Sequence, residues 1–571
     1  MIDLMRHRGP DGDGIFFDDN CGLAHARLAI LDVVGSPQPL HGPGKVAVVN
    51  GEIYNHLSLK SPSYNYSTMG DSEIVLSLHK GKGSAKDHAK WISKLDGMFA
   101  FALWSNDQLI LARDPVGIKP LMRTIVDDTL VFASEAKALR AHESYVPEID
   151  TLAMKARIAW EYPLDATTLF ADVYQVRPGT VEVWELVDGI PKMTSSSRFE
   201  IQKVEPAIDW NDPAGLLESF TLSVSDRLMS DVPVGIVLSG GLDSSLVCAV
   251  AREAAEIAEQ PVPACWTVAE SEDNPDWQAA EVVTSSLDLE HHQHILDPDT
   301  FHSKLPDLAW HGEDLDVTVL FFQPLFSKMS ESVTVGLCGQ GADELHAGYP
   351  RYRDLSKHCK EIQNRLDDMN CNLEELEGDS WWSSNHSPQN HTNSLKDFLQ
   401  FELDHGQLSN FQLRLVDRHS MAHSLEVRVP FLGSRHRDAS NKLPMDWRLP
   451  SSLEEKAALR SAAELTSLPT EIIRRPKLPA GRATSPRMID SLLEDLSPYV
   501  NKVAKRYPEL ERALIKQPEI SIGLGLFEAM HILDGGTHKK QEMSPHCWTR
   551  WLDEFYSRFN PASRRQSRID Y

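Results

Sequence analysis

The pattern of hydrophobic positions divides the chain into two parts that predict different kinds of sheet. Near the N-terminus, short apolar runs alternate with turns, as at 98–104 and 108–113, and such pairs are typical of antiparallel hairpins. From Asp212 onward, short apolar strands such as 234–238 and 263–268 alternate with helical segments. This alternation favours a doubly wound parallel sheet with helices on both faces. We therefore expect the two parts to fold differently.

Local signals add further elements. A helix at 72–78 is expected, with Asp71 as its N-cap. The polar, serine-rich stretch 189–203 is expected to be a connection near a domain boundary at 190–210. An acidic stretch at 372–391 is expected to be an insertion loop. Further strands are expected at 23–31, 45–55, 130–134, 180–186, 292–296 and 333–338, and further helices at 212–228, 246–255 and 276–286.

Length and composition narrow the class of protein. The 571 residues exceed what one hydrophobic core supports, so we expect at least two domains. The chain has 57 Lys and Arg against 83 Asp and Glu, a net charge of −26 that argues against a nucleic-acid-binding protein. The sequence shows no membrane span and no signal-peptide pattern. Seven scattered cysteines without a CxxC pair are typical of reduced thiols in a cytoplasmic protein.

A glycine- and serine-rich turn follows the apolar strand at 234–238. Its sequence, Ser239-Gly-Gly-Leu-Asp-Ser-Ser245, lies between that strand and a helix, an arrangement that directs backbone N–H groups at an anion. The glycines let the backbone approach a phosphate closely, and Asp243 is placed to hold Mg²⁺. Because the GxxxxGK[ST] loop is absent, the pattern favours a nucleotide whose pyrophosphate leaves during attack on the α-phosphorus. The segment resembles the pyrophosphate loop of the ATP pyrophosphatase (PP-loop) superfamily.

Three more segments accompany this turn. Asp343 follows the strand at 333–338, and the carboxyl ends of parallel strands meet at one edge of a sheet, so Asp343 is expected to face Asp243 and share the magnesium. Lys477 ends a loop and is suited to stabilising charge that develops on pyrophosphate. Asp417 lies on a predicted helix that precedes an extended exit.

The N-terminal part carries motifs at strand ends that together are specific. They are RHRGPDG, LAHARLAI, NGEIYN, GDSE, LDGMFAFALW, LARDPVGIKPL and SEAKAL. They resemble the glutaminase domain of class II glutamine amidotransferases, in the version carried by asparagine synthetase. The resemblance implies that Arg27 binds the glutamine α-carboxylate, that Glu52 and Asp71 bind its amino group, and that Asn50 and Gly51 form the oxyanion hole.

One element of that family is not found in this sequence. The family nucleophile is an N-terminal cysteine whose own α-amine serves as base, and it lies on a first strand with MCGI-like sequence. This sequence begins downstream of that strand, at the helix leading into RHRGPDG. We expect either an internal methionine of a longer protein at Met1 or an inactive glutaminase half. Cys21 is a poor substitute because it has no free amine.

The C-terminal motifs, with GADELHAGYPRY at 341–352, resemble the synthetase domain of asparagine synthetase. Many family members have Glu where this chain has Gln340, and that Glu is proposed to take a proton from the attacking ammonia. Glutamine cannot be a general base. Either another acid, such as Glu344, takes that role, or Gln340 orients the substrate. The resemblance implies a catalytic set of Asp243, Asp343, Lys477 and Asp417, with Asp243 and Asp343 as magnesium ligands. It implies that ATP is bound by Val237, Ser239, Gly240, Gly241, Asp243, Ser244, Ser245, Val268, Gly339 and Gln340.

These observations give an expected fold class of α/β and α+β. An N-terminal αββα sandwich of the Ntn type at 1–190, lacking its first strand, is expected to precede a doubly wound PP-loop domain at 210–550 and a disordered basic tail at 558–571. The expected function is ATP- and Mg²⁺-dependent amidation of aspartate to asparagine through β-aspartyl-AMP, with nitrogen from glutamine or ammonia. A homodimer is compatible with this function. Two alternatives stay open: a related PP-loop or β-lactam-synthetase-like enzyme acting on another carboxylate, and a non-catalytic paralogue.

Overall fold

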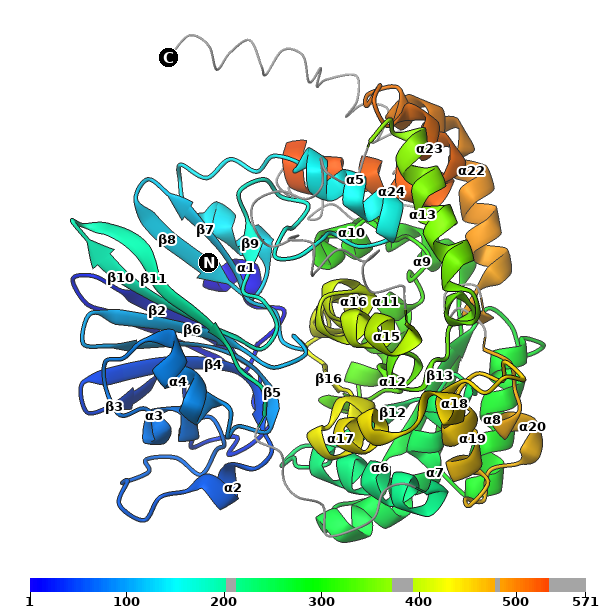
Figure 1. The fold of residues 1–571 in the computed structure, drawn as a ribbon, viewed down its shortest axis with the longest axis horizontal. Coiled ribbons are helices and arrows are strands. Elements are labelled where there is room, and N and C mark those ends of the chain that lie inside the picture. Colours follow the sequence, from blue (N-terminus) through cyan, green and yellow to red (C-terminus); the bar gives the residue numbers. More distant parts are fainter. Residues whose placement is uncertain (202–211, 372–393, 478–482, 534–571) are drawn as a thin grey trace.

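The structure is a computed structural model, and it describes residues 1–201, 212–371, 394–477 and 483–533. The stretch 372–391 and the tail 558–571 lie outside the described residues. The N-terminal half, blue to cyan, lies beside the C-terminal half, green to orange (Figure 1). Among the described helices, none combines the length and the apolar character needed to span a bilayer.

The N-terminal half is built from antiparallel strands. Its largest sheet has the order β11-β10-β6-β5-β4-β3, beside the pair β1-β2 and the three-stranded sheet β8-β7-β9. The predicted hairpin forms from β5 and β6, with Ser105 opposite Gln108. The strands are β1 Gly12–Phe17, β2 Gly22–Arg27, β3 Leu40–Gly42, β4 Lys45–Ile53, β5 Gly97–Ser105, β6 Gln108–Arg113, β7 Met122–Val126, β8 Thr129–Ala133, β9 Tyr174–Gln175, β10 Thr180–Val187 and β11 Ile190–Arg198. The helices are α1 Ile2–Met5, α2 His56–Leu59, α3 Ile74–Leu78, α4 Ala85–Ile92, η1 Ala136–Ala141 and α5 Thr151–Trp160.

Two expectations for this half are wrong. Helix α3 has Glu73 as its N-cap, whereas Asp71 accepts a hydrogen bond from the Ile53 N–H at 2.6 Å and so serves strand β4. The serine-rich stretch expected to be a connection contains β11, which pairs with β10 at the edge of the large sheet. Most side chains of β11 are exposed, so its polar sequence hides the strand from a hydrophobic pattern.

The C-terminal half contains the predicted parallel sheet, in the order β14-β13-β12-β15-β16. The mixed fold class, with antiparallel sheets followed by a parallel sheet, is therefore confirmed. A fifth strand, β16, forms where the sequence predicts only an extended exit. Helix α7 begins at Leu242 and not at 246, so Asp243 and the two serines after it lie in its first turn. The strands are β12 Val234–Val237, β13 Ala264–Ala269, β14 His291–Ile295, β15 Val335–Leu337 and β16 Glu426–Arg428.

Helices surround this sheet and extend beyond it (Figure 1). Those up to residue 371 are α6 Pro213–Arg227, α7 Leu242–Ala258, α8 Pro275–Leu287, α9 Pro298–Ser303, α10 Leu305–Gly312, α11 Phe322–Ser330, α12 Ala342–His346, η2 Pro350–Arg353 and α13 Leu355–Asp368. Those from residue 394 are α15 Leu395–Asp404, η4 Leu408–Gln412, α16 Leu413–Met421, η5 Pro430–Leu432, α17 Ser434–Lys442, α18 Met445–Arg448, α19 Ala457–Ala463, α20 Thr470–Ile473, α22 Pro486–Ala504, α23 Glu511–Lys516, α24 Pro518–Phe527 and η6 Glu528–Leu533.

The two halves share hydrophobic cores. Met98 and Ile118 of the N-terminal half belong to the core that surrounds the parallel sheet. A second core joins Phe170, near β9, to Phe527 of α24, with ring centroids 5.0 Å apart. Because buried apolar surface of each half is covered by the other, the halves are held in one arrangement. That arrangement brings polar groups of both halves into contact.

Candidate functional sites

The glycine turn lies between β12 and α7, as the sequence predicts. Gly240 has φ +68, and a Cβ there would lie 2.6 Å from the Ala279 Cβ, so only glycine fits without strain. Gly241 is the N-cap of α7 and offers no side chain to the first backbone N–H groups of the helix. The Ser239 and Ser244 hydroxyls lie 3.2 Å apart. Free N–H groups and hydroxyls at a helix N-terminus are suited to binding an anion.

Two acids and two lysines meet beside this turn. The Lys456 Nζ lies 2.6 Å from both Asp243 Oδ1 and Asp343 Oδ1. The Lys477 Nζ lies 2.8 Å from Asp343 Oδ2 and 3.7 Å from Asp243 Oδ2. The structure therefore brings together three residues of the predicted catalytic set: Asp243, Asp343 and Lys477. We call the four residues the acid–lysine cluster.

Lys456 is a member of this cluster that the sequence analysis missed. It is 2% exposed and has the left-handed φ of +58, which lets its backbone turn into α19. No motif in the sequence marks it, and a lysine after two glutamates is ordinarily a surface residue. Only the folded structure reveals its role, because a buried ammonium group needs carboxylate partners.

The lysines set the charge state of the acids. Burial raises the pKa of Asp343, but Lys456 and Lys477 overcome this effect and hold that pKa well below its usual value. Burial lowers the pKa of Lys477, but Asp343 and Asp243 raise it above its usual value. Asp343 and Lys477 thus stay ionised near neutral pH. A cluster with two ammonium groups, one of them buried, can accept the negative charge of a polyphosphate.

A pair of hydrogen-bonded amide side chains begins at Gln340, three residues before Asp343. Gln340 donates a hydrogen bond to the Gln412 side chain, which in turn donates to the Tyr349 hydroxyl at 2.6 Å. Gln412 ends a π-helical turn, η4, and such turns are frequent at functional sites. Glu344 lies in the same helix as Asp343, and both of its carboxyl oxygens are buried without a hydrogen bond among the described residues. Burial and the neighbouring acids raise its pKa to about 8.

The other predicted ATP-binding residues lie at the same edge of the sheet. Val237 ends β12, Val268 is the next-to-last residue of β13, and Gly339 follows β15 by two residues. A Cβ on Gly339 would lie 2.8 Å from the Asp243 Cβ, so a larger residue would displace that acid. Ser245 is fully buried, and its hydroxyl has no hydrogen bond within the described part of the chain.

A cavity of about 690 Å³ lies in the N-terminal half and reaches the C-terminal half. Its wall contains Met421 and Glu426 from the C-terminal half. A cavity of this size matches those that hold small ligands. All five predicted glutamine-binding residues line it: Arg27, Asn50, Gly51, Glu52 and Asp71.

Two acids in this cavity have raised pKa values. Burial and the neighbouring Asp71 raise the pKa of Glu52 well above its usual value, against the influence of Arg428. Burial raises the pKa of Asp71 to about 6, although the Ile53 N–H opposes this. The Arg428 Nη2 lies 3.6 Å from Glu52 Oε1. Two buried acids with so little cationic compensation are suited to binding an ammonium group.

The remaining cavity residues have partners of their own. The Arg27 guanidinium donates to the carbonyl oxygens of Val33 at 2.6 Å and Asp32 at 2.9 Å. The Asn50 amide lies 3.4 Å from the Ser134 hydroxyl. Gly51 has φ +122, a conformation that requires glycine and that turns its backbone away from regular β geometry.

Cys21 also lines the cavity but lacks the features of a nucleophile. Burial and the nearby Asp18 raise the pKa of its thiol to about 12. A nucleophilic cysteine needs the opposite, a thiolate favoured by a base or a cation. The expectation that Cys21 is a poor substitute for the family nucleophile agrees with this environment.

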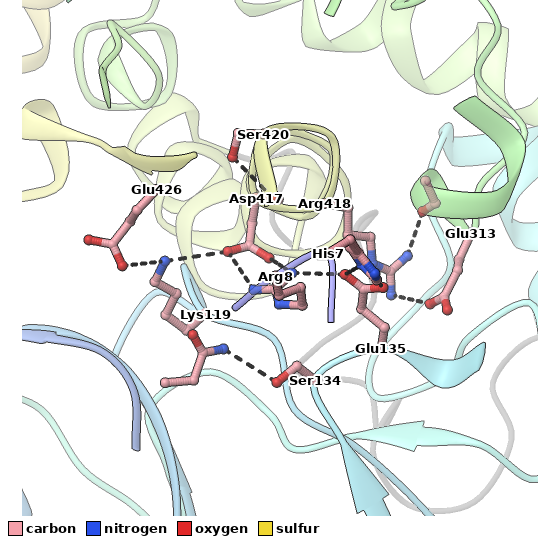
Figure 2. Close-up of polar contacts among 12 residues, drawn as sticks. His7, Arg8, Lys119, Ser134, Glu135, Glu313, Asp417, Arg418, Ser420 and Glu426 are labelled. Atoms are coloured by element: carbon pink, nitrogen blue, oxygen red, sulfur yellow. Dashed lines mark hydrogen bonds and ion pairs between the residues drawn. The ribbon is translucent and has the colours of Figure 1, made fainter. Parts of the chain in front are cut away.

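Asp417 lies at the interface between the halves, where it pairs with cations of the N-terminal half (Figure 2). The Arg8 guanidinium holds it through two contacts, at 2.8 and 3.2 Å, and Lys119 lies 3.5 Å away. Arg8 also binds Glu135 at 2.9 Å, and Lys119 binds Glu426 at 3.0 Å. The structure thus places Asp417 in interdomain ion pairs and not in the acid–lysine cluster.

One group of side chains at this interface has the composition of a metal site. The ligand atoms of His7, Glu135 and His311 lie within 4.8 Å of one another. Glu135 already pairs with two cations, Arg8 and Lys137. Its negative charge is therefore compensated within the ion pairs of the interface.

The comparisons with known proteins match both halves. Residues 215–548 match the family model for asparagine synthase, and residues 1–191 match the model for a glutamine amidotransferase domain. The class is therefore that of C–N bond-forming ligases that combine an amidotransferase-type half with a synthase half. Because the asparagine synthase match spans more than half of the chain, this chain belongs to the asparagine synthase family.

Curated relatives share this organisation over most of their length. The chain is 29% identical over 539 residues to glutamine-hydrolyzing asparagine synthetase 1 of Bacillus subtilis (strain 168), covering 84% of this chain and 82% of the relative. It is 29% identical over 513 residues to asparagine synthetase B of Escherichia coli (strain K12), covering 86% and 80%. It is also 29% identical over 508 residues to the asparagine synthetase of Mus musculus, covering 83% and 79%.

Proposed function

We propose that the chain amidates aspartate to asparagine, using ATP and releasing AMP and pyrophosphate. The observation that carries this proposal is the acid–lysine cluster beside the glycine turn, at the strand ends of the half that matches asparagine synthase. The aspartate β-carboxylate attacks the α-phosphorus of ATP, which forms β-aspartyl-AMP and pyrophosphate. Ammonia then displaces AMP and forms the amide.

The cluster residues have separate tasks in this proposal. Lys456 and Lys477 stabilise the charge that develops on pyrophosphate, since both ammonium groups are fixed before the reaction. The turn binds phosphate oxygens through the backbone and hydroxyls at Ser239, Gly240, Gly241, Ser244 and Ser245, and Val237, Val268, Gly339 and Gln340 border the nucleoside. Gln340, bonded to Gln412, orients substrate and does not act as a base. Asp417 positions the halves through Arg8.

Asp243 and Asp343 fit the requirements of Mg²⁺. Carboxylate and hydroxyl oxygens are its preferred ligands, and the two acids face one point between the lysines. A bound magnesium ion would neutralise charge on the pyrophosphate. Because both acids hold a lysine, those ammonium groups are expected to bind phosphate oxygens when the ion is present.

The cavity of the N-terminal half is proposed to bind glutamine as a nitrogen source. Glu52 and Asp71 bind the α-ammonium group, and Arg27 binds the carboxylate after releasing the loop carbonyls. Asn50 and Gly51 supply the donors that face the amide oxygen. We place the protein in the cytoplasm, because the six described cysteines are free thiols.

Pyrophosphate release by the purified chain tests this function. With ATP, Mg²⁺ and ammonium present, release is expected to depend on aspartate and to stop when glutamate replaces it. A parallel reaction with glutamine in place of ammonium measures the nitrogen supply separately. Release that is unaffected by omitting aspartate, or no release at all, would contradict the proposal.

A further inference from the structure

Charged side chains form one continuous chain from the glutamine cavity across the interface. Arg428 lies 3.6 Å from Glu52 and 3.0 Å from Glu426. Lys119 joins Glu426, at 3.0 Å, to Asp417, at 3.5 Å. Arg8 joins Asp417 to Glu135, and Lys137 ends the chain beside Glu135. Figure 2 shows the part from Glu426 to Glu135, in which acids and cations alternate.

Beside the four acids and four cations of this chain lies a fifth acid, Asp71, which neighbours Glu52 and has no ion pair among the described residues. His7, at its far end, has its pKa lowered by burial, so it adds no positive charge near neutral pH. The acids are Glu52, Asp71, Glu426, Asp417 and Glu135, and the cations are Arg428, Lys119, Arg8 and Lys137. All nine are buried, so water screens this imbalance poorly.

The unmatched negative charge lies at the cavity end. Glu52 Oε2 and the Arg428 Nη2 have no hydrogen-bond partner among the described residues, whereas Asp417 and Glu426 each have a close ion pair. Glu52 and Asp71 repel each other, and both line the cavity. The cavity, which both acids line, therefore offers a place for the missing cation.

Arg428 is the member that joins this end to the C-terminal half. It is fully buried on β16, and its Nη1 donates to the carbonyl oxygens of Arg227 and Met229 at 2.9 and 2.6 Å. Its own carbonyl accepts a hydrogen bond from the Cys338 N–H at 3.0 Å, just before Gln340. The guanidinium is thus held by carbonyl groups at the end of α6 and just after it, which belong to the C-terminal half and not to the cavity.

We propose that Arg428 is a positioning residue of the glutamine cavity, and that the substrate ammonium group is the missing cation that completes this interdomain charge chain. The inference rests on the proposed glutamine site. Arg428 favours the ionised form of Glu52 against the effects of burial and Asp71, and it leaves Oε2 of that carboxyl group without a hydrogen bond among the described residues. Without Arg428, the two acids would hold a proton more tightly, and glutamine would have to displace it in order to bind. The glutamine site is therefore incomplete without the C-terminal half.

The test compares two ligands that differ only in the amino group: L-glutamine and glutaramate, which lacks it. Calorimetric titration of the full chain is expected to show that Arg428→Met lowers glutamine affinity by about tenfold or more and changes glutaramate affinity less than about twofold. Arg428→Lys, which keeps the charge, is expected to recover part of the loss. Arg435→Met, the same change at an exposed position of α17, serves as the matched control.

A second pair of variants separates positioning from a loss of folding. Glu52→Gln alone is expected to remove the preference for glutamine, and adding Arg428→Met to it should cost little more, because the two residues act together. Equal losses for both ligands in Arg428→Met, or equal affinities in all variants, would overturn the inference. If the unmodified chain binds no glutamine, the inference is also wrong. Aspartate- and ammonium-dependent pyrophosphate release tests the synthase assignment independently of these titrations.

Discussion

Each of the two sites contains a pair of acidic side chains, but the two pairs differ in how closely cations approach them. In the acid–lysine cluster, two ammonium groups lie within 3 Å of Asp343 and hold its pKa low. In the glutamine cavity, Glu52 has only Arg428 at 3.6 Å, and the pKa values of both acids are raised. The first setting is prepared for an anion and the second for a cation. Residue type alone thus does not decide what a pair of buried acids binds. The cations that the fold places beside the acids decide it.

The largest effect is expected from Asp343→Asn. The substitution leaves two buried lysines with one carboxylate, and it removes a proposed magnesium ligand, so ammonium-dependent pyrophosphate release should fall about a thousandfold. Glutamine affinity, measured by calorimetry, should not change, and this result would show that the two sites can be altered independently. Glu361→Gln, at an exposed helical position, is the control. Retention of full activity would contradict the role of the cluster.

Lys456→Met is expected to leave the acids of the acid–lysine cluster with less cationic compensation, as in the glutamine cavity. With Lys456 gone, Asp243 and Asp343 share only Lys477, so pyrophosphate release should fall about a hundredfold. Loss of a buried ion-pair partner should also lower the free energy of unfolding by about 3 kcal/mol, measurable by denaturant titration. Lys357→Met, at a position where the side chain is 74% exposed, should change neither quantity. An active variant of unchanged stability would show that Lys456 is dispensable.

Acidity is expected to weaken glutamine binding in the cavity. Below pH 6, Asp71 binds a proton that the ammonium group of glutamine must displace, while Glu52, Glu426 and Arg428 face the same space. Glutamine affinity should therefore rise up to about tenfold per pH unit as pH increases toward 6, and the raised pKa of Glu52 should add to this rise. Asp71→Asn should flatten this dependence. Since the pKa of Asp343 is held low, ATP binding should not show the same rise. Titrations of glutamine at pH 5, 6 and 7 measure this dependence, and an affinity that does not change with pH in the unmodified chain would contradict the prediction.

The smallest effect is expected from Cys21→Ala. Because burial and Asp18 favour the thiol over the thiolate, activity with either nitrogen source should stay within about twofold of the unmodified chain. Ser93→Ala, at the C-cap of α4, is a control for removal of a small polar side chain. A selective loss of glutamine-dependent activity would instead identify Cys21 as a participant.

The sequence was sufficient to predict regular elements and local motifs. The apolar run at β12 and the alternation of strands and helices predicted the parallel sheet, and the spacing of Asp243 and Asp343 after two strands placed them at one edge. Strand β11 was missed because an edge strand exposed to water needs no apolar face. Lys456 and Arg428 were missed because their roles depend on contacts between residues more than two hundred positions apart. The resemblance implied a catalytic role for Asp417 but could not reveal its partner Arg8, which comes from the other half.

The shared cores have a consequence for synthesis of the protein in the cell. Met98, Val116 and Ile118 lie in a core whose other members begin at Phe220. As the chain leaves the ribosome, these side chains stay uncovered until the parallel sheet has been made. A nascent N-terminal half therefore presents an apolar surface to chaperones for as long as translation of the second half takes.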